Sequence, residues 1–318
     1  MKNGRTVVAI VGPTASGKST LASLVAERLK SAVVSVDAMQ VYRGMDIGTA
    51  KTPVDKRTCP LFMVDVADVT DDYSVSLFQH DARACVDGLL GWGKVPVLCG
   101  GTGLYLDAVI DEMDFPAGER GGENRQHYEQ IAEEEGPEAL YAILVERDPQ
   151  SAELIHPNNI RRVVRALEML DEGVSYADQH EGISSHEPHY DARIWSIELP
   201  REELYARIDM RVDQMIADGL VEEVRTLIDA GLTRDSTAGQ AIGYKEIIAM
   251  LDGECTPEQA IGQIKARTRR YAKRQLSWLR RDGRAQQIDA HAVSPEEAAD
   301  LIVQDALTKR GSPSDGSL

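Results

Sequence analysis

A glycine-rich segment near the N-terminus, GPTASGKS at residues 12–19, has the spacing of a phosphate-binding loop, G-x-x-x-x-G-K-[ST]. The β-branched run Thr6–Val11 precedes it and apolar residues at helical spacing follow it, so a strand, a turn and a helix are expected in that order. Backbone N–H groups and Lys18 would bind a diphosphate or triphosphate, and Ser19 is placed to ligate an accompanying Mg²⁺. The predicted anion site comprises Gly12, Pro13, Thr14, Ala15, Ser16, Gly17, Lys18 and Ser19. A turn without a ligand is the alternative.

A carboxylate follows the next apolar run. Asp37 comes one position after residues 33–36, and in phosphate-loop folds the second strand ends beside the loop. We therefore expect Asp37 to face the anion pocket, where an acid can accept a proton from a nucleophile or hold Mg²⁺ through water. A cap on the following turn is the structural alternative. Residues 44–51, GMDIGTAK, have the glycines and the lysine of a second binding loop.

The strongest charge signal lies near the C-terminus. Residues 261–284 contain nine basic residues and one acid, Asp282. On a helix, one face of this segment is apolar, a second carries arginines, and a third carries Tyr271, Gln275 and Trp278. Such a surface can neutralise a phosphate backbone and stack unpaired bases. The alternative is a solvated helix that pairs with the chain's own acids.

Three other features are ambiguous from the residues alone. Arg161, Arg162 and Arg165 form a smaller basic cluster on an expected helix, which is more typical of a salt-bridged surface. Thr102, in the turn GGTG, can bond a ligand or cap the next helix. The spacing of the apolar residues around Arg225 places that arginine on the exposed face of an amphipathic helix.

Short apolar runs alternate with helical patterns over the first hundred residues. Residues 6–11, 32–36 and 95–99 are the expected strands, and residues 21–29 and 77–90 the expected helices between them. This alternation predicts an α/β fold, a phosphate-loop NTPase-like parallel sheet flanked by helices. The turn GGTG ends the third strand at the carboxyl edge of the sheet, where ligands bind in open α/β folds.

Changes of composition along the chain predict its organisation. We expect a first part of the core (1–113), a mainly helical insertion (114–199), the remainder of the core with the basic helix (200–308) and a disordered tail (309–318). The first half of the insertion is acidic, with ten acids and three bases in residues 117–153. Residues 176–190 are expected to form a mobile loop, and residues 193–199 a strand.

Bulk properties limit the class of protein. The chain has 318 residues, of which 42% are apolar, enough for a sizeable core. Its formal net charge of −17 argues, taken alone, against a nucleic-acid partner, but the basic segment reverses that charge locally. No long apolar run or signal-like leader is present, and the four cysteines are far apart, so a reduced cytoplasm and no membrane contact are expected. A monomer is the default expectation.

Six blocks of the sequence, in this order, resemble the tRNA dimethylallyltransferase (isopentenyltransferase) family. They are GPTASGKST at 12–20, SVDAMQVYRGMDIGTAK at 35–51, GGTGLY at 100–105, HPNNIRRVVRALE at 156–168, QAIGYKE at 240–246 and KRQLSWLR at 273–280. The first block alone is unspecific, whereas the second and third are highly specific. The resemblance covers about residues 5 to 290.

The resemblance implies transfer of a dimethylallyl group from dimethylallyl diphosphate, with Mg²⁺, to the exocyclic amine of the adenosine on the 3′ side of a tRNA anticodon, in tRNAs that read codons beginning with U. It makes Asp37 the proposed general base, and it assigns Thr14, Lys18 and Arg225 to the diphosphate oxygens. The flipped adenosine would reach Asp37 from the side opposite the diphosphate. Residues matching the tRNA-contacting segments are Asp37, Ala38, Met39, Gln40, Thr102, Arg161, Arg162, Arg165, Gln240, Gly243, Tyr244, Lys245, Lys273, Arg274, Gln275, Trp278 and Arg280. The first half of the insertion is acidic, which departs from the expectation that the insertion contacts the phosphates of tRNA.

Other functions explain part of the sequence. A phosphate-loop kinase, with Asp37 activating a hydroxyl group, accounts for residues 6–110 and leaves the basic helix without a role. An isopentenyltransferase that acts on AMP or ADP shares the donor site but needs no large RNA surface. A non-catalytic RNA-binding module would have no use for Lys18, Ser19 and Asp37 together.

Overall fold

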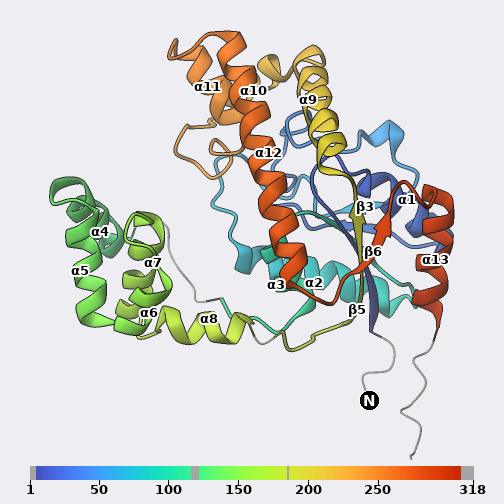
Figure 1. Cartoon of the computed structure of the whole chain (residues 1–318), viewed down its shortest axis with the longest axis horizontal. Helices are drawn as coiled ribbons and strands as arrows, with labels where there is room; N and C mark the ends of the chain where they lie inside the picture. Colours follow the sequence, from blue (N-terminus) through green and yellow to red (C-terminus); the bar gives the residue numbers. More distant parts are fainter. Residues whose placement is uncertain (1–4, 116–121, 185, 309–318) are drawn as a thin grey trace, which may run out of the picture. The chain divides into compact units, whose positions relative to one another are not determined.

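The computed structural model describes residues 5–115, 122–184 and 186–308 (Figure 1). The chain forms two compact units: unit 1 contains Met1–Ile110 and Tyr190–Leu318, and unit 2 contains Asp111–His189. The expected disordered tail, 309–318, lies outside the described residues. None of the helices in the described part of the chain is long and apolar enough to cross a membrane.

Unit 1 is built on a six-stranded parallel sheet with the strand order β3-β2-β4-β1-β5-β6. The strands are β1 (Thr6–Val11), β2 (Val33–Ser35), β3 (Leu61–Phe62), β4 (Val97–Gly100), β5 (Asp191–Glu198) and β6 (Gln286–Asp289). The expected strands at 6–11, 32–36 and 95–99 are thus confirmed within two residues. The short edge strands β3 and β6 were not expected, because neither has a sustained apolar run.

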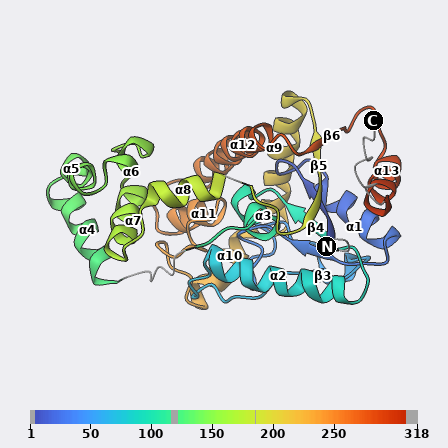
Figure 2. The same cartoon turned by 90° about the horizontal axis from the view of Figure 1, so that it is seen from below.

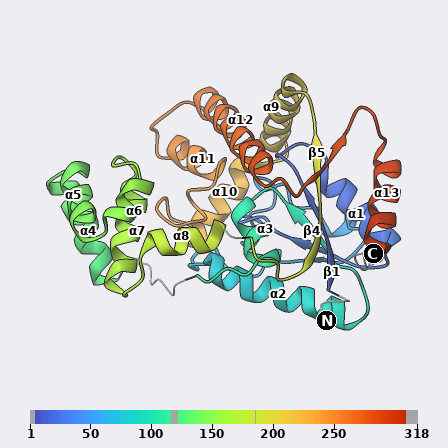
Figure 3. The same cartoon turned by 60° about the horizontal axis from the view of Figure 1, so that its bottom comes forward.

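Helices cover both faces of the sheet, as the alternation of strands and helices predicts (Figure 3). These helices are α1 (Lys18–Arg28) and α13 (Pro295–Leu307) on one face, and α2 (Val75–Gly91) and α3 (Gly103–Ile110) on the other. Unit 1 also contains α9 (Arg201–Ala217), α10 (Leu220–Asp229), α11 (Tyr244–Leu251), α12 (Pro257–Arg281) and a 3-10 turn η1 at Val54–Lys56. Side chains of β1 alternate between two apolar clusters: Val7 packs with α2 and α3, and Val8 packs with α1 and α13. This two-sided burial explains why the strand is apolar throughout its length.

The basic helix α12 is 25 residues long and begins at a well-formed cap. Thr256 Oγ1 accepts a hydrogen bond from the backbone N–H of Gln259, and Gln259 Oε1 accepts one from the backbone N–H of Thr256. Pro257 occupies the first turn. The helix lies beside α9 (Figure 2), and Ala272 packs with Leu204 and Ile208 of that helix. Tertiary packing therefore fixes which side of α12 faces the protein.

All regular elements among the described residues of unit 2 are helices, apart from an isolated bridge between Asp111 and Pro188. Its helices are α4 (Glu123–Glu134), α5 (Pro137–Arg147), α6 (Pro149–Leu154), α7 (Ile160–Asp171) and α8 (Tyr176–Ser184). Leu140 and Leu144 of α5 pack with Val163 and Leu167 of α7 in a core of its own. The expected loop at 176–190 is wrong in its first half, where α8 forms.

The C-terminal boundary of the insertion also differs from the prediction of 114–199. Strand β5 pairs with β1 from Thr6–Asp191 to Val11–Ser196, so residues 190–199 belong to unit 1. Because the strand pattern of residues 193–199 requires a neighbouring strand for its backbone N–H and C=O groups, it could not have remained in an all-helical unit. The N-terminal boundary, at residue 111, lies close to the expected one.

Candidate active site

Three loops lie together at the carboxyl edge of the sheet because β2, β4 and β1 are adjacent strands. The loop after β1 contains residues 12–17, the loop after β2 contains Asp37, and the loop after β4 contains Gly101 and Thr102. All three strands are parallel, so their ends meet at one edge. The sheet topology therefore brings together residues that are up to 90 positions apart in the chain.

The loop after β1 has the local structure that anion binding requires. Gly17 has φ +90°, a left-handed conformation that glycine adopts readily, and it is the N-cap of α1. Lys18, at the start of α1, donates a hydrogen bond from Nζ to the carbonyl oxygen of Pro13 (3.3 Å). Ser16 Oγ is buried and has no hydrogen-bond partner among the described residues. A buried hydroxyl without a partner costs free energy, which a bound anion would recover.

An arginine from α9 completes this pocket. Arg211 donates a hydrogen bond from Nη1 to Thr14 Oγ1 (3.3 Å). Burial lowers the pKa of the Arg211 guanidinium and the pKa of the Lys18 ammonium, and the Asp37 carboxylate opposes both shifts. Two cations and one carboxylate therefore share a site in which fewer water molecules screen them, and their charges act strongly on a bound ligand.

The structure does not bring Arg225 to this pocket, so its assignment to the diphosphate is wrong. Its side chain is 55% exposed on α10, and its Nε lies 3.5 Å from Oε1 of Glu222 on the same helix. Arg211, which sequence reasoning missed, makes the contact with Thr14 instead. A signal was present: Arg211 follows the buried Leu204 and Ile208 at helical spacing, so it is a cation on the apolar side of α9.

Asp37 lies close enough to Lys18 and Arg211 for its carboxylate to act on both cations. Its Oδ1 accepts a hydrogen bond from the backbone N–H of Met39 (2.9 Å), so the structural alternative, a turn cap, is correct. The carboxylate influences the pKa of Lys18, Arg211 and Tyr271, which come from three different helices. The second oxygen of a carboxylate capped in this way can still accept a proton from a ligand.

The glycines of GGTG allow α12 to approach the loops closely. A Cβ on Gly101 would lie 2.2 Å from Gln275 Nε2, and a Cβ on Gly103 would lie 2.3 Å from the Trp278 ring. Gln275 uses this proximity: its Oε1 accepts from Thr14 N (2.9 Å) and its Nε2 donates to Gly101 O (2.9 Å). One buried amide thus connects the loop after β1 to the loop after β4.

The nine basic residues of the segment 261–284 fall into two groups. Lys265 pairs with Asp213, Arg267 with Glu246, Arg269 with Asp209 and Arg284 with Asp282, as the salt-bridged alternative anticipated. A second group is exposed and makes no ion pair with any residue that the structure describes. We call this group the outward cations: Arg270, Lys273, Arg274, Arg280 and Arg281.

Comparisons with known proteins identify the family of this chain. The model of the IPP transferase family matches residues 40–282, and that of the isopentenyl transferase family matches residues 5–58. The chain belongs to the IPP transferase family. It is 41% identical over 302 residues to the tRNA dimethylallyltransferase of Carboxydothermus hydrogenoformans, covering 94% of this chain and 97% of that one. It is 44% identical over 290 residues to that of Clavibacter sepedonicus, covering 89% and 93%.

Solved structures of the family have the same fold. The full-length tRNA isopentenylpyrophosphate transferase of Bacillus halodurans is 38% identical with a TM-score of 0.70, over 95% of this chain and 96% of that one. A eukaryotic dimethylallyltransferase, crystallised acting on tRNA, is 28% identical with a TM-score of 0.78, over 94% and 78%. The α/β fold expected from the sequence is thereby confirmed.

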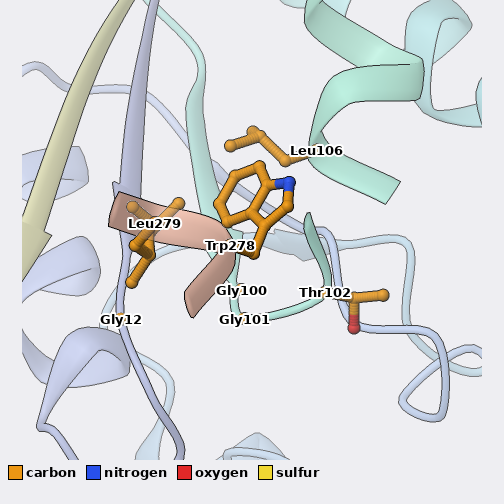
Figure 4. Close-up of a pocket in the computed structure, with 8 residues that line it drawn as sticks. Gly12, Gly100, Gly101, Thr102, Leu106, Trp278 and Leu279 are labelled. Carbon is orange, nitrogen blue, oxygen red and sulfur yellow. The ribbon is translucent and has the colours of Figure 1, made fainter. Parts of the chain in front are cut away.

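Two residues matched to tRNA contacts of the IPP transferase family are engaged within this chain instead. Gln275 is buried between two loops, and Trp278 donates from Nε1 to Asp107 Oδ2 (3.1 Å). Figure 4 shows the indole between Leu106 and Leu279, above the glycine turn, where these residues line a narrow crevice. The expectation that Trp278 is a stacking surface for RNA bases is therefore wrong for this structure, because packing against Gly103 takes its place.

The matched residues around 240–245 are also engaged within the fold. Tyr244 is fully buried and donates a hydrogen bond to Glu223 (2.6 Å), so it is not available to RNA. Gly243, with φ +99°, begins α11 and is buried. Gln240 donates from Nε2 to Arg234 O (2.7 Å) and accepts from Lys245 Nζ (2.8 Å). The side chains of Gln240 and Lys245 are thus bonded to each other and partly buried.

The predicted second binding loop, residues 44–51, is wrong as a ligand site. Lys51 Nζ is buried and donates to Tyr42 O (2.6 Å), Asp46 (2.9 Å) and Asp65 (2.5 Å). These three bonds use every donor of the ammonium group. Glu223 accepts from the backbone N–H groups of residues 46, 47 and 48. The specific sequence of this loop therefore reflects its own internal bonding.

The remaining matched residues lie near Asp37 or in unit 2. Gln40 accepts from Ser35 Oγ (2.8 Å) and donates to Thr49 O (3.2 Å), while Ala38 and Met39 are partly buried beside Asp37. Arg161 and Arg162 are exposed on α7 of unit 2. Arg165 lies 3.9 Å from Glu168 on that helix, as the salt-bridged alternative predicts.

Proposed function

We propose that this chain transfers a dimethylallyl group from dimethylallyl diphosphate to the N6 amine of the adenosine 3′-adjacent to the anticodon, in tRNAs that read codons beginning with U. The observation that supports the proposal is that Lys18 and Arg211 both bond the loop after β1, at Pro13 and Thr14, with Asp37 close enough to act on both cations. Family membership supports tRNA prenylation, since the curated relatives are named tRNA dimethylallyltransferases.

The loop after β1 and Arg211 would hold the diphosphate. Aromatic amines are poor nucleophiles, so the reaction depends on the departure of diphosphate. Lys18, Arg211 and the N-terminus of α1 would stabilise the negative charge that grows on its oxygens as the carbon–oxygen bond breaks. Thr14 would orient the group through its hydroxyl, which already accepts a hydrogen bond from Arg211.

The residues present fit a magnesium ion with the diphosphate. Ser19 lies exposed at the N-terminus of α1, next to Lys18, and Asp37 faces the same pocket, so oxygen donors of the kind that Mg²⁺ prefers are available. When bound, the ion would neutralise charge on the diphosphate. Ser19 would be its direct protein ligand.

Asp37 would act on the acceptor. As the new carbon–nitrogen bond forms at N6, the amine becomes positively charged and must lose a proton, which the free oxygen of the Asp37 carboxylate would accept. The outward cations would bind the phosphates of the anticodon stem-loop near this pocket. A monomer in the cytoplasm suffices for this chemistry.

One assay separates this function from its alternatives. The protein is incubated with labelled dimethylallyl diphosphate and bulk tRNA, with AMP, or with ATP and small-molecule acceptors. We expect label in a prenylated adenosine of digested tRNA. Label in AMP alone would favour the free-nucleotide enzyme, and ATP turnover alone would favour the kinase. Absence of any transfer, with tRNA still bound, would favour the non-catalytic module.

A further inference from the structure

Tyr271 is a polar side chain of α12 for which the proposed reaction has no role so far. Its ring is partly buried on the side of the helix that faces the loops, one turn before Gln275. Its hydroxyl oxygen lies 3.3 Å from Thr102 Oγ1. The guanidinium of Arg274, an outward cation, lies over the other face of the ring, 5.5 Å from its centre. The phenol is therefore held between the basic surface and the loops of the site.

Thr102 connects Tyr271 to the segment that carries the proposed base. Thr102 Oγ1 accepts a hydrogen bond from the backbone N–H of Ala38 (3.4 Å), the residue directly after Asp37. Asp37 in turn bonds the N–H of Met39. A continuous path of three hydrogen bonds thus runs from Tyr271 through Thr102 and the turn at 38–39 to the Asp37 carboxylate.

The Tyr271 hydroxyl keeps its proton in this environment. Burial and the Asp37 charge raise the pKa of Tyr271, so the phenol stays protonated at neutral pH. A protonated phenol and the Thr102 hydroxyl can bond with either group as the donor. In both cases Thr102 Oγ1 also accepts the backbone N–H of Ala38, so the bond to Tyr271 restrains the side chain that holds this turn.

We propose that Tyr271 is a positioning residue for the transfer reaction, which holds Thr102 and, through it, the Asp37–Ala38 turn in the geometry that accepts the proton from the adenosine amine. The inference rests on the proposed function of Asp37. It also gives the inward side of α12 a part in the reaction that is separate from RNA binding.

A double-mutant cycle tests this route. Tyr271→Phe removes only the hydroxyl, and Thr102→Val removes its partner. We expect each single variant to lower kcat for prenyl transfer by about three- to tenfold, the worth of one net hydrogen bond, with the KM for dimethylallyl diphosphate unchanged. Tyr271→Phe, which changes no residue matched to tRNA contacts, should also leave the tRNA Kd unchanged. Because both changes break one path, the double variant should be no slower than Thr102→Val alone.

Tyr190 supplies a matched control. It is also a buried tyrosine with an arginine over its ring, Arg5 at 4.8 Å, and a bonded hydroxyl, 2.9 Å from Asp87. Tyr190 lies at the amino end of β5, whereas the candidate site lies at the carboxyl ends of the strands. Tyr190→Phe should therefore leave kcat within twofold of the wild-type value. This control shows whether the loss of any bonded tyrosine hydroxyl lowers the rate.

Several outcomes would overturn the proposal. A kcat within twofold of wild type for Tyr271→Phe would do so, and so would multiplicative losses in the double variant, since independent effects do not share a path. If Tyr271→Phe failed to fold, by its melting curve, an unchanged kcat for Thr102→Val would overturn it equally. The proposed function fails differently: the wild-type chain itself would then transfer no prenyl group.

Discussion

Along the last turns of α12, the side chains that face the sheet and those that face away from it make opposite kinds of contact. Gln275 and Trp278 are bonded to Thr14, Gly101 and Asp107 of the protein itself. The outward cations make no ion pair with any described residue. The block 273–280 contains Gln275 and Trp278 together with three outward cations, because successive helical residues point about 100° apart. A block that the family resemblance assigns to RNA contact therefore contains residues of two kinds.

Substitutions on the two sides of α12 should therefore have different effects. Changes at the loops, or at residues bonded to them, should alter the rate of transfer or the stability of the fold. Changes among the outward cations should alter tRNA affinity. The five predictions below test that division, from the largest expected effect to the smallest.

Lys18→Ala should have the largest effect on rate. Without the ammonium, the leaving diphosphate loses a close positive charge, and we expect prenyl transfer to fall by about 10³–10⁵. Gel-shift titration should show tRNA affinity within twofold of wild type, because Lys18 lies at the donor loop. Loss of tRNA binding in this variant would contradict the division between donor pocket and RNA surface.

Asp37→Asn should have the second largest effect. An amide keeps the size of the side chain but cannot accept the proton from N6, so turnover should fall by about 10²–10⁴. Single-turnover transfer to tRNA measures this loss directly. The Met39 N–H can still bond the amide oxygen, so the melting temperature serves as the control. Near-normal turnover would remove Asp37 from the mechanism.

Arg211→Ala and Arg225→Ala distinguish the two arginines. Loss of Arg211 removes the guanidinium bonded to Thr14, and transfer should fall by about 10²–10³. Loss of Arg225 removes an exposed contact with Glu222, and transfer should stay within twofold. Steady-state rates at saturating tRNA measure both. The reverse order of effects would show that Arg225 reaches the donor.

Two double variants compare the exposed cations of α12 with the cations that are paired within the protein. Lys273→Ala with Arg280→Ala should weaken tRNA binding by about tenfold and reduce the salt dependence of the binding constant by about two in the log–log slope. Lys265→Ala with Arg269→Ala removes two cations already paired with Asp213 and Asp209, so a smaller change is expected. Equal effects of the two pairs would mean that burial and pairing do not decide which cations bind RNA.

Trp278→Phe should have the smallest effect on function. The ring still fills the crevice beside Leu106, but the hydrogen bond to Asp107 is lost, so the free energy of unfolding should fall by about 1 kcal/mol. Denaturant titration measures this change, and tRNA affinity should stay within twofold. An unchanged free energy of unfolding together with weaker tRNA binding would show that Trp278 contacts RNA.

Much of the core of this fold was predictable from local pattern. The strand 6–11 and the helix after it follow from a buried apolar run, a glycine in a left-handed conformation and helical spacing, all of which act within a few residues. The edge strands β3 and β6 were not predictable in the same way. Leu61–Phe62 and Gln286–Asp289 form strands only because a neighbouring strand offers them backbone partners.

The residues of the candidate site also differ in whether local sequence predicts their roles. Lys18 and Asp37 were identified because each lies directly beside a strong local pattern. Arg211 was missed because its contact with Thr14 crosses 197 positions of the chain. Tyr244 and Trp278 were assigned to RNA by their position in matching blocks, yet Tyr244 is buried and bonded to Glu223, and Trp278 is partly buried against Gly103.

The sequence by itself determined the phosphate-loop pattern, the carboxylate after the second strand, the concentration of positive charge in α12 and the family. These follow from residue types and short spacings. Only the tertiary structure decided that Arg211 rather than Arg225 reaches Thr14 and that Lys51 is bonded to Tyr42, Asp46 and Asp65 of the protein itself. It also decided that Gln275 ties two loops together while Lys273 faces outward. The physical reason is that a side chain's role depends on what packs against it, and packing partners come from distant parts of the chain.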